Sequence, residues 1–383
     1  MKIVFITSAA YLDTCLPLVN DLAQKNEICL LINFSFNTKN ISFLNIKENF
    51  KENQIIHEGN YLLGDMIKLL DNSLRIKITF IYWKSWKIFS IKNWLFVKNI
   101  YNLINGEIIH TQLLSIYYLF LLRIKKRKVK KIVIDFHDPF EHQGSSESIL
   151  LNYTKSSFIK IASNIIIHNH SQLNPFMKKY NIMNNVDVVP LGIIPLNKIY
   201  RVQNVKTNTN NILFFGRIEP YKGIEYFVEA VKKIKKNNLN FKAIIAGNGK
   251  FYFDISNLYN DPYFKIINRY ITNEEMVRLI QESKFVVCPY IESTQSGVVM
   301  TVFAFFKPVI ASNIGGFTEI IQDGITGRLV SVRDVDALVS AISEYLTDEN
   351  KIQVISSNIK NLVISGKFSW HNIAEKTLKI YNK

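Results

Sequence analysis

Short runs of β-branched and other apolar residues alternate with helix-length segments along the chain, and this alternation limits the possible folds more than any other feature. KIVFIT (2–7) precedes a segment with helical periodicity, LDTCLPLVNDLAQK, which is followed by ICLLINF (28–34). The pattern is typical of βαβ units, in which helices cover both faces of a parallel sheet. It continues with further predicted strands at 77–82, 107–111, 131–136, 164–168, 186–190, 211–215, 241–247, 264–268, 284–290 and 308–312.

The alternation lapses once, in the polar stretch RVQNVKTNTN (201–210). A chain of 383 residues, 48% of them hydrophobic, has enough apolar material for two cores and is too long for one ordinary domain. We therefore predict an α/β protein with two Rossmann-like domains, residues 1–204 and 205–369. The last segment, 370–383, has apolar residues at helical spacing, and we expect it to pack back on the first domain as an amphipathic helix.

The cysteines and the N-terminal sequence indicate the cellular compartment of the protein. Cys15, Cys29 and Cys288 lack metal-ligand spacing and lie in apolar surroundings, which indicates buried thiols and a cytoplasmic protein. The N-terminus has no basic region followed by a sustained apolar stretch, and the longest apolar run, 113–122, is too short to cross a bilayer. We expect neither a signal peptide nor a transmembrane helix.

The positive charge is strongly local. Residues 72–134 contain 13 Lys or Arg and a single acid, Glu107, a net +12 out of +16 for the chain. Trp83, Trp86 and Trp94 lie among these lysines. Interfacial tryptophans with basic residues favour an anionic membrane surface, so we predict a peripheral protein on the inner face of the cell membrane. Nucleic acid is the competing use of such a surface, and we do not expect it as a partner.

Ligands of open parallel sheets bind beyond the carboxyl ends of the strands, so the residues after each predicted strand are the first candidates for a site. In GRIEPYKG (216–223), Gly216 ends a strand and is followed by Arg217 and Lys222. A guanidinium can hold two phosphate oxygens while an ammonium supplies a point charge, which suits a diphosphate. The alternative is a surface turn with two solvated cations.

A second candidate is the polar loop after the strand at 284–290. Backbone amides at the start of the helix that follows would face an anion, because the first turn of a helix has N–H groups without internal partners. Side chains of the loop would bind sugar hydroxyls, or else serve as helix caps and loop residues. These side chains are Glu292, Ser293, Gln295 and Ser296.

Two further places carry weaker signals. His137, Asp138 and His142 follow the strand at 131–136, where a metal site is the obvious rival to a structural role. We find no further His, Asp or Glu cluster with supporting spacing and predict no metal. In the segment 313–330, the pair Gly315 and Gly316 allows close backbone approach, with Glu319 at a helix start.

The order of these motifs resembles the family 4 glycosyltransferases of the GT-B fold, in which two Rossmann-like domains face each other across a cleft. The first half of the chain carries the likeness only in FHD (136–138), IIIH (165–168) and VVPLGI (188–193). The second half carries most of it, in GRIEPYKG (216–223), AGNGK (246–250), the stretch 295–321, DGITGRLV (323–330), VRDVDALVSAI (332–342) and FSW (368–370).

The resemblance implies transfer of a sugar from a nucleotide diphosphate sugar, with retention of anomeric configuration and without a required metal or other cofactor. Arg217 and Lys222 would hold the donor diphosphate and His137 would touch the donor sugar, while the backbone at Tyr270 and Ile271 would meet the base. The remaining donor-binding residues would be Gly216, Gly247, Glu292, Ser293, Gln295, Ser296, Gly297, Val298 and Thr301.

The chain departs from the family pattern at two acids. Many relatives carry two Glu residues separated by seven residues, and this chain has Ser293 and Thr301 at those positions. Glu292, one residue earlier, would replace the first of the two acids.

The motif QSG (295–297) is similar to that of a bacterial subset that acts in cell-surface polysaccharide assembly, with a glycan or lipid-linked acceptor. A catalytically inactive binding subunit at the membrane and a GT-B epimerase or phosphorylase remain alternatives. A Rossmann oxidoreductase is excluded, because the first turn, TSAAYLDTC, contains no glycine.

Overall fold

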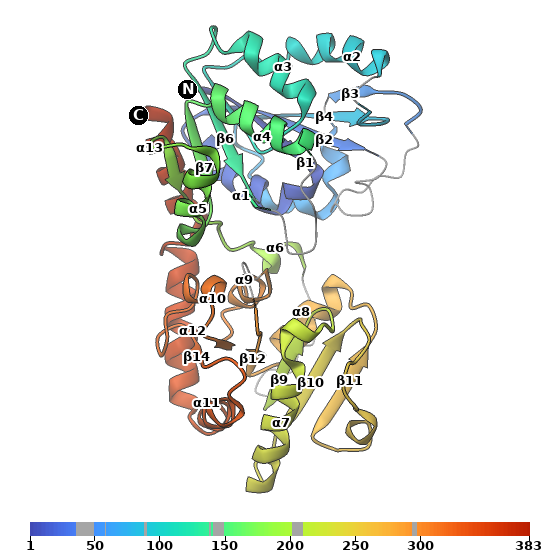
Figure 1. The fold of residues 1–383 in the computed structure, drawn as a ribbon, viewed down its shortest axis with the longest axis vertical. Helices are drawn as coiled ribbons and strands as arrows, with labels where there is room; N and C mark the ends of the chain where they lie inside the picture. Colours follow the sequence, from blue (N-terminus) through green and yellow to red (C-terminus); the bar gives the residue numbers. More distant parts are fainter. Residues whose placement is uncertain are drawn as a thin grey trace. The chain divides into compact units, whose positions relative to one another are not determined.

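The computed structural model divides the chain into two compact units. The first unit comprises Met1–Gly192 and Lys367–Lys383, and the second comprises Ile193–Gly366 (Figure 1). The structure describes residues 1–35, 50–57, 59–87, 90–137, 139–140, 149–200, 210–292 and 297–383.

The first unit is built on one eight-stranded sheet of order β3-β4-β2-β1-β5-β6-β7-β8. All described neighbours pair in parallel except β3 and β4, which are antiparallel. The seven parallel strands confirm the sequence prediction, whereas the short edge strand β3 was missed. The strands are β1 (Lys2–Ser8), β2 (Glu27–Ser35), β3 (Gln54–His57), β4 (Ile76–Trp83), β5 (Ile108–Thr111), β6 (Lys131–Phe136), β7 (Asn164–Ile167) and β8 (Val186–Val188).

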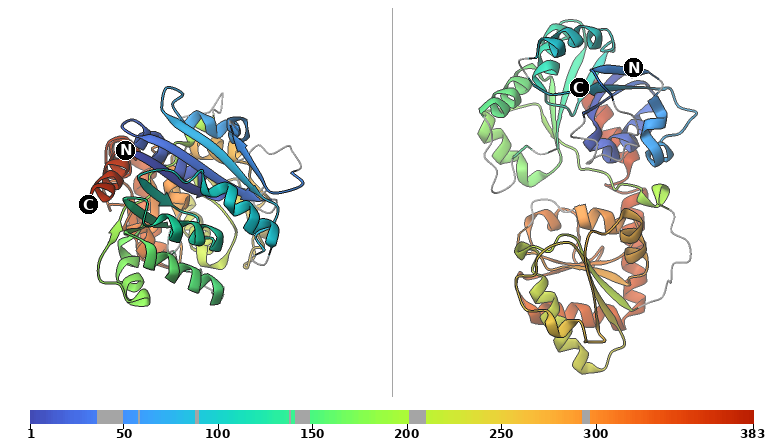
Figure 2. Two further views of the ribbon diagram at one scale, coloured as in Figure 1. Left: turned by 90° about the horizontal axis from the view of Figure 1, so that it is seen from above. Right: turned by 90° about the vertical axis from the view of Figure 1, so that its right-hand side faces the viewer.

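Helices cover both faces of this sheet, as its continuously apolar strands require. One face carries α2, α3 and α4, and the other carries α1 together with the C-terminal helix α13 (Figures 1 and 2). None of the helices in the described ranges has the length and apolar composition needed to cross a membrane. The helical segments are η1 (Ala9–Tyr11), α1 (Leu12–Ala23), η3 (Gly59–Leu69), α2 (Ile91–Tyr101), α3 (Ile116–Lys125), α4 (Ile149–Ile161), α5 (His170–Tyr180) and α13 (Trp370–Asn382).

The C-terminal helix α13 belongs to the first unit although it follows the whole second unit in sequence. Ser369 caps its first turn by accepting a hydrogen bond from the backbone N–H of Asn372. Its buried face, which includes Ile373 and Ile380, packs on α1, and Lys25 pairs with Glu375 at 3.0 Å. The first core is therefore completed by a segment from the far end of the chain.

The division between the units lies at Gly192–Ile193, ahead of the predicted boundary at 204/205. The predicted linker falls mostly on residues 201–209, which lie outside the described ranges. The short helix α6 (Leu196–Ile199) groups with the second unit, where Asn273 donates a hydrogen bond to the Tyr200 hydroxyl at 2.7 Å.

The second unit has a six-stranded, wholly parallel sheet of order β11-β10-β9-β12-β13-β14. Five of its strands confirm the prediction, and the three-residue β14 was missed. The strands are β9 (Asn211–Phe215), β10 (Lys242–Gly247), β11 (Phe264–Asn268), β12 (Phe285–Cys288), β13 (Val309–Ser312) and β14 (Arg328–Val330). Besides α6, the helical segments are η4 (Pro220–Lys222), α7 (Ile224–Ile234), η5 (Lys235–Asn237), η6 (Ser256–Leu258), α8 (Asn273–Gln281), α9 (Gly297–Phe303), α10 (Gly315–Thr318), α11 (Val335–Thr347) and α12 (Glu349–Ile364).

The three cysteines are free thiols. Cys15 and Cys288 are buried and Cys29 is half-buried, which agrees with the expected apolar surroundings. Burial raises the pKa of the Cys288 thiol to about 12, so this thiol is protonated and unreactive at neutral pH.

Candidate functional site

The second unit concentrates the predicted residues where its strand order reverses, between β9 and β12. At such a switch point the loops leaving the two strands turn to opposite faces, and ligands bind between them. Gly216 follows β9, Gly247 ends the neighbouring β10, and Tyr290 follows β12. The sheet topology therefore gathers three separate sequence motifs at one edge.

Two glycines make this edge a bare backbone surface. A Cβ on Gly247 would lie 1.8 Å from the carbonyl oxygen of Gly216, so the loops after β9 and β10 are in direct backbone contact. The Gly216 N–H donates to the Ala246 carbonyl at 3.0 Å and fixes that contact. A ligand can therefore approach the main chain closely here.

Lys222 lies against this glycine edge. It ends η4, is only 6% exposed, and its Nζ would be 2.7 Å from a Cβ placed on Gly216. Nζ donates to the Tyr290 hydroxyl at 3.0 Å, and in the described part of the chain no carboxylate forms an ion pair with it. Burial lowers the pKa of Lys222, and burial also raises that of Tyr290, which keeps the phenol neutral. A buried cation paired with a neutral hydroxyl is suited to an anionic ligand.

Arg217 follows Gly216 and is exposed. The backbone on its far side is fixed, because the Ile218 N–H donates to the Asn248 carbonyl at 3.0 Å and Ile218 forms a β-bridge with Gly249. The guanidinium is thus carried by a rigid turn beside the glycine edge.

The start of α9 also lies at this edge. Val298 Cγ2 is 4.0 Å from the position of a Cβ on Gly216, and among the described residues no atom lies within 4 Å of the Cβ position of Gly297. One turn later, Thr301 is half-buried and its hydroxyl donates to the Gly297 carbonyl at 2.7 Å. The structure thus joins Val298 to the glycines and Lys222.

The other predicted donor residues are less closely gathered. Tyr270 is 74% exposed and Ile271 half-buried, both after β11, two strands away from β9. Glu292 is exposed after β12. Ser293, Gln295 and Ser296 lie outside the described residues. Tyr290 is the residue that sequence reasoning missed, because the predicted strand 284–290 included it, whereas β12 ends at Cys288.

In the first unit, His137 follows β6 and lies beside a buried polar network. Its ring stacks on Tyr11 at a centroid distance of 4.2 Å and lies 4.9 Å from the ring of His168, which follows β7. Burial lowers the pKa of His137 to about 4, so the imidazole is neutral at neutral pH. Asp138 and His142, the other residues predicted here, lie outside the described ranges.

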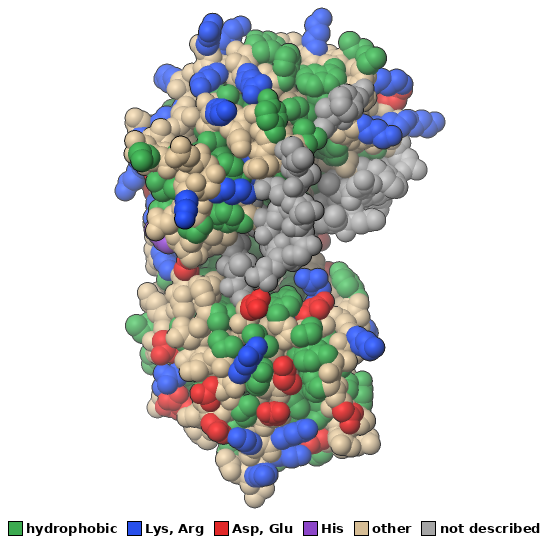
Figure 3. Space-filling model, in the orientation of Figure 1, with side chains coloured by type: hydrophobic (Ala, Val, Ile, Leu, Met, Phe, Trp, Pro, Cys, Tyr) green, Lys and Arg blue, Asp and Glu red, His purple; other side chains and the backbone are tan. Residues whose placement is uncertain are grey.

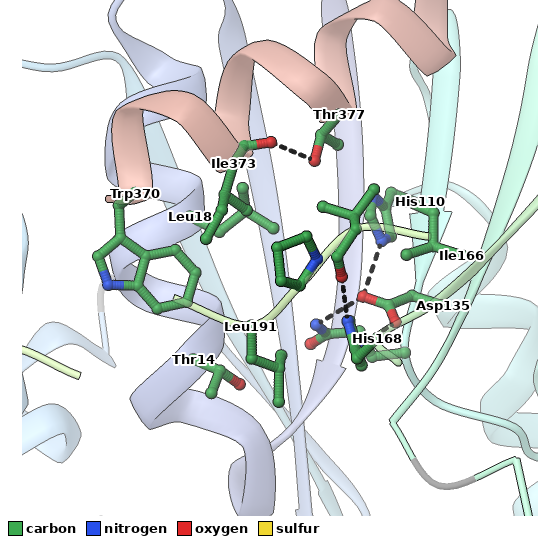
Figure 4. A pocket seen from close by; sticks show the side chains of 13 residues that line it. Thr14, Leu18, His110, Asp135, Ile166, His168, Leu191, Trp370, Ile373 and Thr377 are labelled. Carbon is green, nitrogen blue, oxygen red and sulfur yellow. Dashed lines mark hydrogen bonds and ion pairs between the residues drawn. The ribbon is translucent and has the colours of Figure 1, made fainter. Parts of the chain in front are cut away.

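The network centres on Asp135, which is 2% exposed (Figure 4). Its carboxylate lies 2.9 Å from His168 Nε2 and 3.4 Å from His110 Nε2. Burial alone would raise the pKa of Asp135, but the charge of His168 and hydrogen bonds with His110 and His168 hold it well below its usual range. The arrangement stabilises a carboxylate in the core.

From the sequence we considered His137, Asp138 and His142 here and predicted no metal, whereas the structure brings His137 together with Asp135 and His168. These last three residues come from two neighbouring strands, so sequence spacing did not bring them together. The available signal was polar residues at the ends of apolar strands, in IDFH (134–137) and IIIH (165–168).

Residues 209–348 match the family described as Glycosyl transferases group 1. An uncharacterized glycosyltransferase of Methanocaldococcus jannaschii is 29% identical over 46% of this chain and 46% of its own. The lipopolysaccharide 1,2-N-acetylglucosaminetransferase of Salmonella typhimurium is 26% identical over 50% of this chain and 55% of its own. The chain thus matches about half the length of these curated relatives.

Solved structures resemble the whole chain. Alr3699/HepE of Anabaena, in complex with UDP, has a TM-score of 0.64 at 14% identity, with complete coverage of both chains. The sucrose-phosphate synthase of Thermosynechococcus elongatus has a TM-score of 0.64 at 16% identity, covering 100% of this chain and 98% of its own. These likenesses show the fold, and they confirm the predicted GT-B architecture of two Rossmann-like domains.

Proposed function

We propose that this chain is a glycosyltransferase that moves a sugar from a nucleotide diphosphate sugar to an acceptor. The observation that carries the proposal is Lys222, a buried cation without a carboxylate partner in the described chain, set against the Gly216 edge. This edge lies in the segment that matches the glycosyltransferase family. The relative in complex with UDP supports a nucleotide donor.

In the proposed reaction, Lys222 and the adjacent Arg217 hold the diphosphate. The leaving nucleoside diphosphate gains negative charge as the glycosidic bond breaks, and cations fixed beforehand stabilise that charge more in the transition state than in the ground state. Both charges are supplied by side chains, so we propose that the transfer needs no divalent ion. We also propose that the backbone at Tyr270 and Ile271 meets the base.

In this proposal, His137 contacts the sugar of the donor. A neutral imidazole can accept or donate a hydrogen bond to a sugar hydroxyl without adding charge beside the reacting carbon. We further propose that the product keeps the anomeric configuration of the donor. Proton NMR of the newly formed linkage measures this, and an inverted product would contradict it.

A screen of nucleotide sugars by thermal shift tests the donor proposal. A ligand present at about 100 times its Kd stabilises the folded state by about 2.7 kcal/mol, which raises the melting temperature measurably. We expect one nucleotide diphosphate and its sugar conjugate to do so. A folded chain that binds no nucleotide would favour an inactive binding subunit, and conversion of the donor without acceptor would favour an epimerase.

Thr301 replaces an acid that would accept hydrogen bonds from ribose hydroxyls in relatives. Thr301 is half-buried, and its hydroxyl donates to the Gly297 carbonyl on the surface of α9. The longer side chain of a Glu at this position can therefore extend from the helix with its carboxylate unburied. We expect Thr301→Glu to tighten nucleotide binding about tenfold, since charge-assisted hydrogen bonds are about twice as strong as neutral ones. Calorimetry with UDP and GDP measures this change.

A melting curve controls for the fold of Thr301→Glu, and we expect the free energy of unfolding to change by less than about 1 kcal/mol. Thr301→Ser is the matched variant, since it keeps the hydroxyl and should leave nucleotide affinity unchanged. A well-folded Thr301→Glu protein with weaker nucleotide binding would show that Thr301 does not face the ribose.

We propose that the acceptor is a glycan or a lipid-linked glycan of the cell surface, and that α2 and α3 rest on the membrane that presents it. Exposed apolar side chains on these helices include Ile91 (76%), Leu95 (68%) and Phe120 (47%). Exposed Lys98 and Lys126 flank them, and Figure 3 shows basic and hydrophobic side chains interspersed over the first unit. This combination suits an anionic bilayer surface.

The three tryptophans contribute unequally to this surface. Trp83 is fully buried, stacks on Tyr117 and donates to the Asn33 side chain at 2.9 Å, so its predicted place at the interface is wrong. It ends β4, which lies between β3 and β2 in the sheet, and its large ring fills the core. Trp86 is half-buried against the core, while Trp94 keeps 36% exposure and contacts Phe120.

We expect the protein to float with anionic liposomes and not with neutral ones. Each Lys near the surface contributes on the order of 1 kcal/mol, so Lys98→Ala and Lys126→Ala should each weaken binding about fivefold, and salt should weaken it further. Lys232→Ala, on an exposed part of α7, is the control and should float normally. Equal recovery with neutral and anionic vesicles would refute the electrostatic docking.

A further inference from the structure

We propose that Asp135, His137 and His168 form a binding site for a transition-metal ion of the Zn²⁺ class inside the first unit. One potential ligand atom from each residue lies within 4.8 Å of the others. The register explains the meeting: Phe136 pairs with Ile167 in the parallel β6–β7 ladder, so the residues that follow them, His137 and His168, leave the sheet side by side. The ion would use Nε2 of His137 and leave Nδ1 of the same ring for the proposed contact with the donor sugar.

The orientation of His168 is that of a metal ligand. Its Nδ1 lies 2.8 Å from the Val189 carbonyl oxygen, which can only accept, so Nδ1 carries the hydrogen. Its Nε2 lies 2.9 Å from Asp135 Oδ1, and therefore either bears a second proton or offers a lone pair to a cation shared with the carboxylate. Histidine ligands of metals commonly donate their other ring N–H to a backbone carbonyl in this way.

The carboxylate is oriented as well. Asp135 Oδ2 accepts a hydrogen bond from Gln112 Nε2 at 3.1 Å and faces His110 Nε2 at 3.4 Å, while Oδ1 is turned toward His168 (Figure 4). Gln112 is itself held by the Thr7 hydroxyl, which donates to its Oε1 at 2.8 Å. These outer contacts keep one carboxylate oxygen for the proposed ion, as supporting hydrogen bonds do around metal sites.

His137 supplies the third donor. Its ring is fixed by the stack on Tyr11, with an angle of 10° between the ring planes. Its Nε2 is buried and makes no hydrogen bond with any residue in the described ranges. A buried ring nitrogen without a partner costs free energy, and a coordinated cation would remove that cost.

The donor set selects the class of metal. Two imidazoles and one carboxylate suit Zn²⁺ and its neighbours, whereas Mg²⁺ and Ca²⁺ prefer oxygen ligands alone. Bonds of about 2.1 Å in a tetrahedral arrangement place neighbouring ligand atoms about 3.4 Å apart, within the range spanned by this cluster. Asp135 is 2% exposed and His168 is 6% exposed, so the site has the closed character of a structural metal.

The test uses the full chain, stripped with chelator and then titrated with Zn²⁺. We expect one Zn²⁺ per chain by elemental analysis, a higher melting temperature with metal, and visible absorption bands of tetrahedral character when Co²⁺ replaces Zn²⁺. Asp135→Asn and His168→Gln should each lower Zn²⁺ affinity by more than about 100-fold, since loss of an outer-shell partner alone costs about 10- to 100-fold. UDP affinity should not change in either variant.

Two matched variants separate ligation from general damage. His110→Gln removes a buried neighbour of the same carboxylate and should cost at most about 100-fold in Zn²⁺ affinity. His57→Gln, on the exposed edge strand β3, should change nothing. Unchanged melting of the wild-type chain with Zn²⁺, together with no Co²⁺ spectrum, would overturn the proposal and identify the Asp135–His168 contact as an imidazolium–carboxylate ion pair.

Discussion

Replacement of Lys222 by Met, or of Arg217 by Ala, is expected to lower the rate of sugar transfer by about 10²- to 10³-fold. Lys222→Met keeps the aliphatic volume that packs beside Tyr290 and removes only the buried charge. Because that charge would act on the departing diphosphate, the loss should appear in kcat more than in KM. Initial rates with saturating donor, measured by release of nucleoside diphosphate, give the comparison.

The control for the cation variants is Lys232→Ala, an exposed lysine on α7 that follows the same loop. It should retain full activity, and melting curves should show that both test variants are folded. Wild-type turnover in both Lys222→Met and Arg217→Ala would contradict the proposal that these residues bind the diphosphate. A loss confined to one variant would assign the charge stabilisation to that residue alone.

Gly223→Ala should destabilise the second unit by about 3 kcal/mol. Gly223 has φ +61° and joins Lys222 to α7, and a Cβ there would lie 2.2 Å from the Pro289 carbonyl oxygen. The left-handed conformation costs a non-glycine residue about 1–2 kcal/mol, and overpacking adds about 1–3 kcal/mol. Denaturant unfolding monitored by fluorescence measures the change, and nucleotide binding should weaken because Lys222 is displaced.

Alanine substitutions at two other glycines separate the cost of the left-handed backbone conformation from the cost of the steric overlap. Gly324 has φ +74°, and in the described part of the chain no atom lies within 4 Å of its Cβ position. Gly324→Ala should therefore cost only the roughly 1–2 kcal/mol of the left-handed conformation. Gly315 has no positive φ and no neighbour within 4 Å among the residues that the structure describes, so Gly315→Ala should change stability by less than about 0.5 kcal/mol. Equal stability of Gly223→Ala and Gly315→Ala would contradict the steric argument.

Most of the parallel strands could be predicted from the sequence because they are continuous apolar runs buried on both faces. The edge strands β8 and β11 are only partly buried, but their β-branched residues still indicated strands. The strands that were missed lack a continuous buried apolar run: β3 is a half-exposed edge strand of four residues, and β14 is three residues long. Their pairing depends on the neighbouring strand, which periodicity within the segment does not reveal. Trp83 was assigned to the surface because lysines surround it in sequence, although its strand continues into the core.

The residues of the candidate site also fall into a part that the sequence could predict and a part that it could not. Gly216, Arg217 and Lys222 stand in one local motif, so the sequence was sufficient to select them. Tyr290 and the partners of Asp135 become visible only when different strands end at the same edge, because strand order and register decide which residues meet. The long-range part of a site therefore depends on topology.

The position of α13 has a consequence for how the protein is made. Residues 367–383 complete the first unit but are synthesised only after every residue of the second unit. Until then, the face of α1 that receives Ile373 and Ile380 has no cover, while the second unit already has all of its strands. Chains that end at Gly366 and have been released from the ribosome should therefore present a folded second unit and a protease-sensitive first unit, which reverses the usual order of folding from the N-terminus.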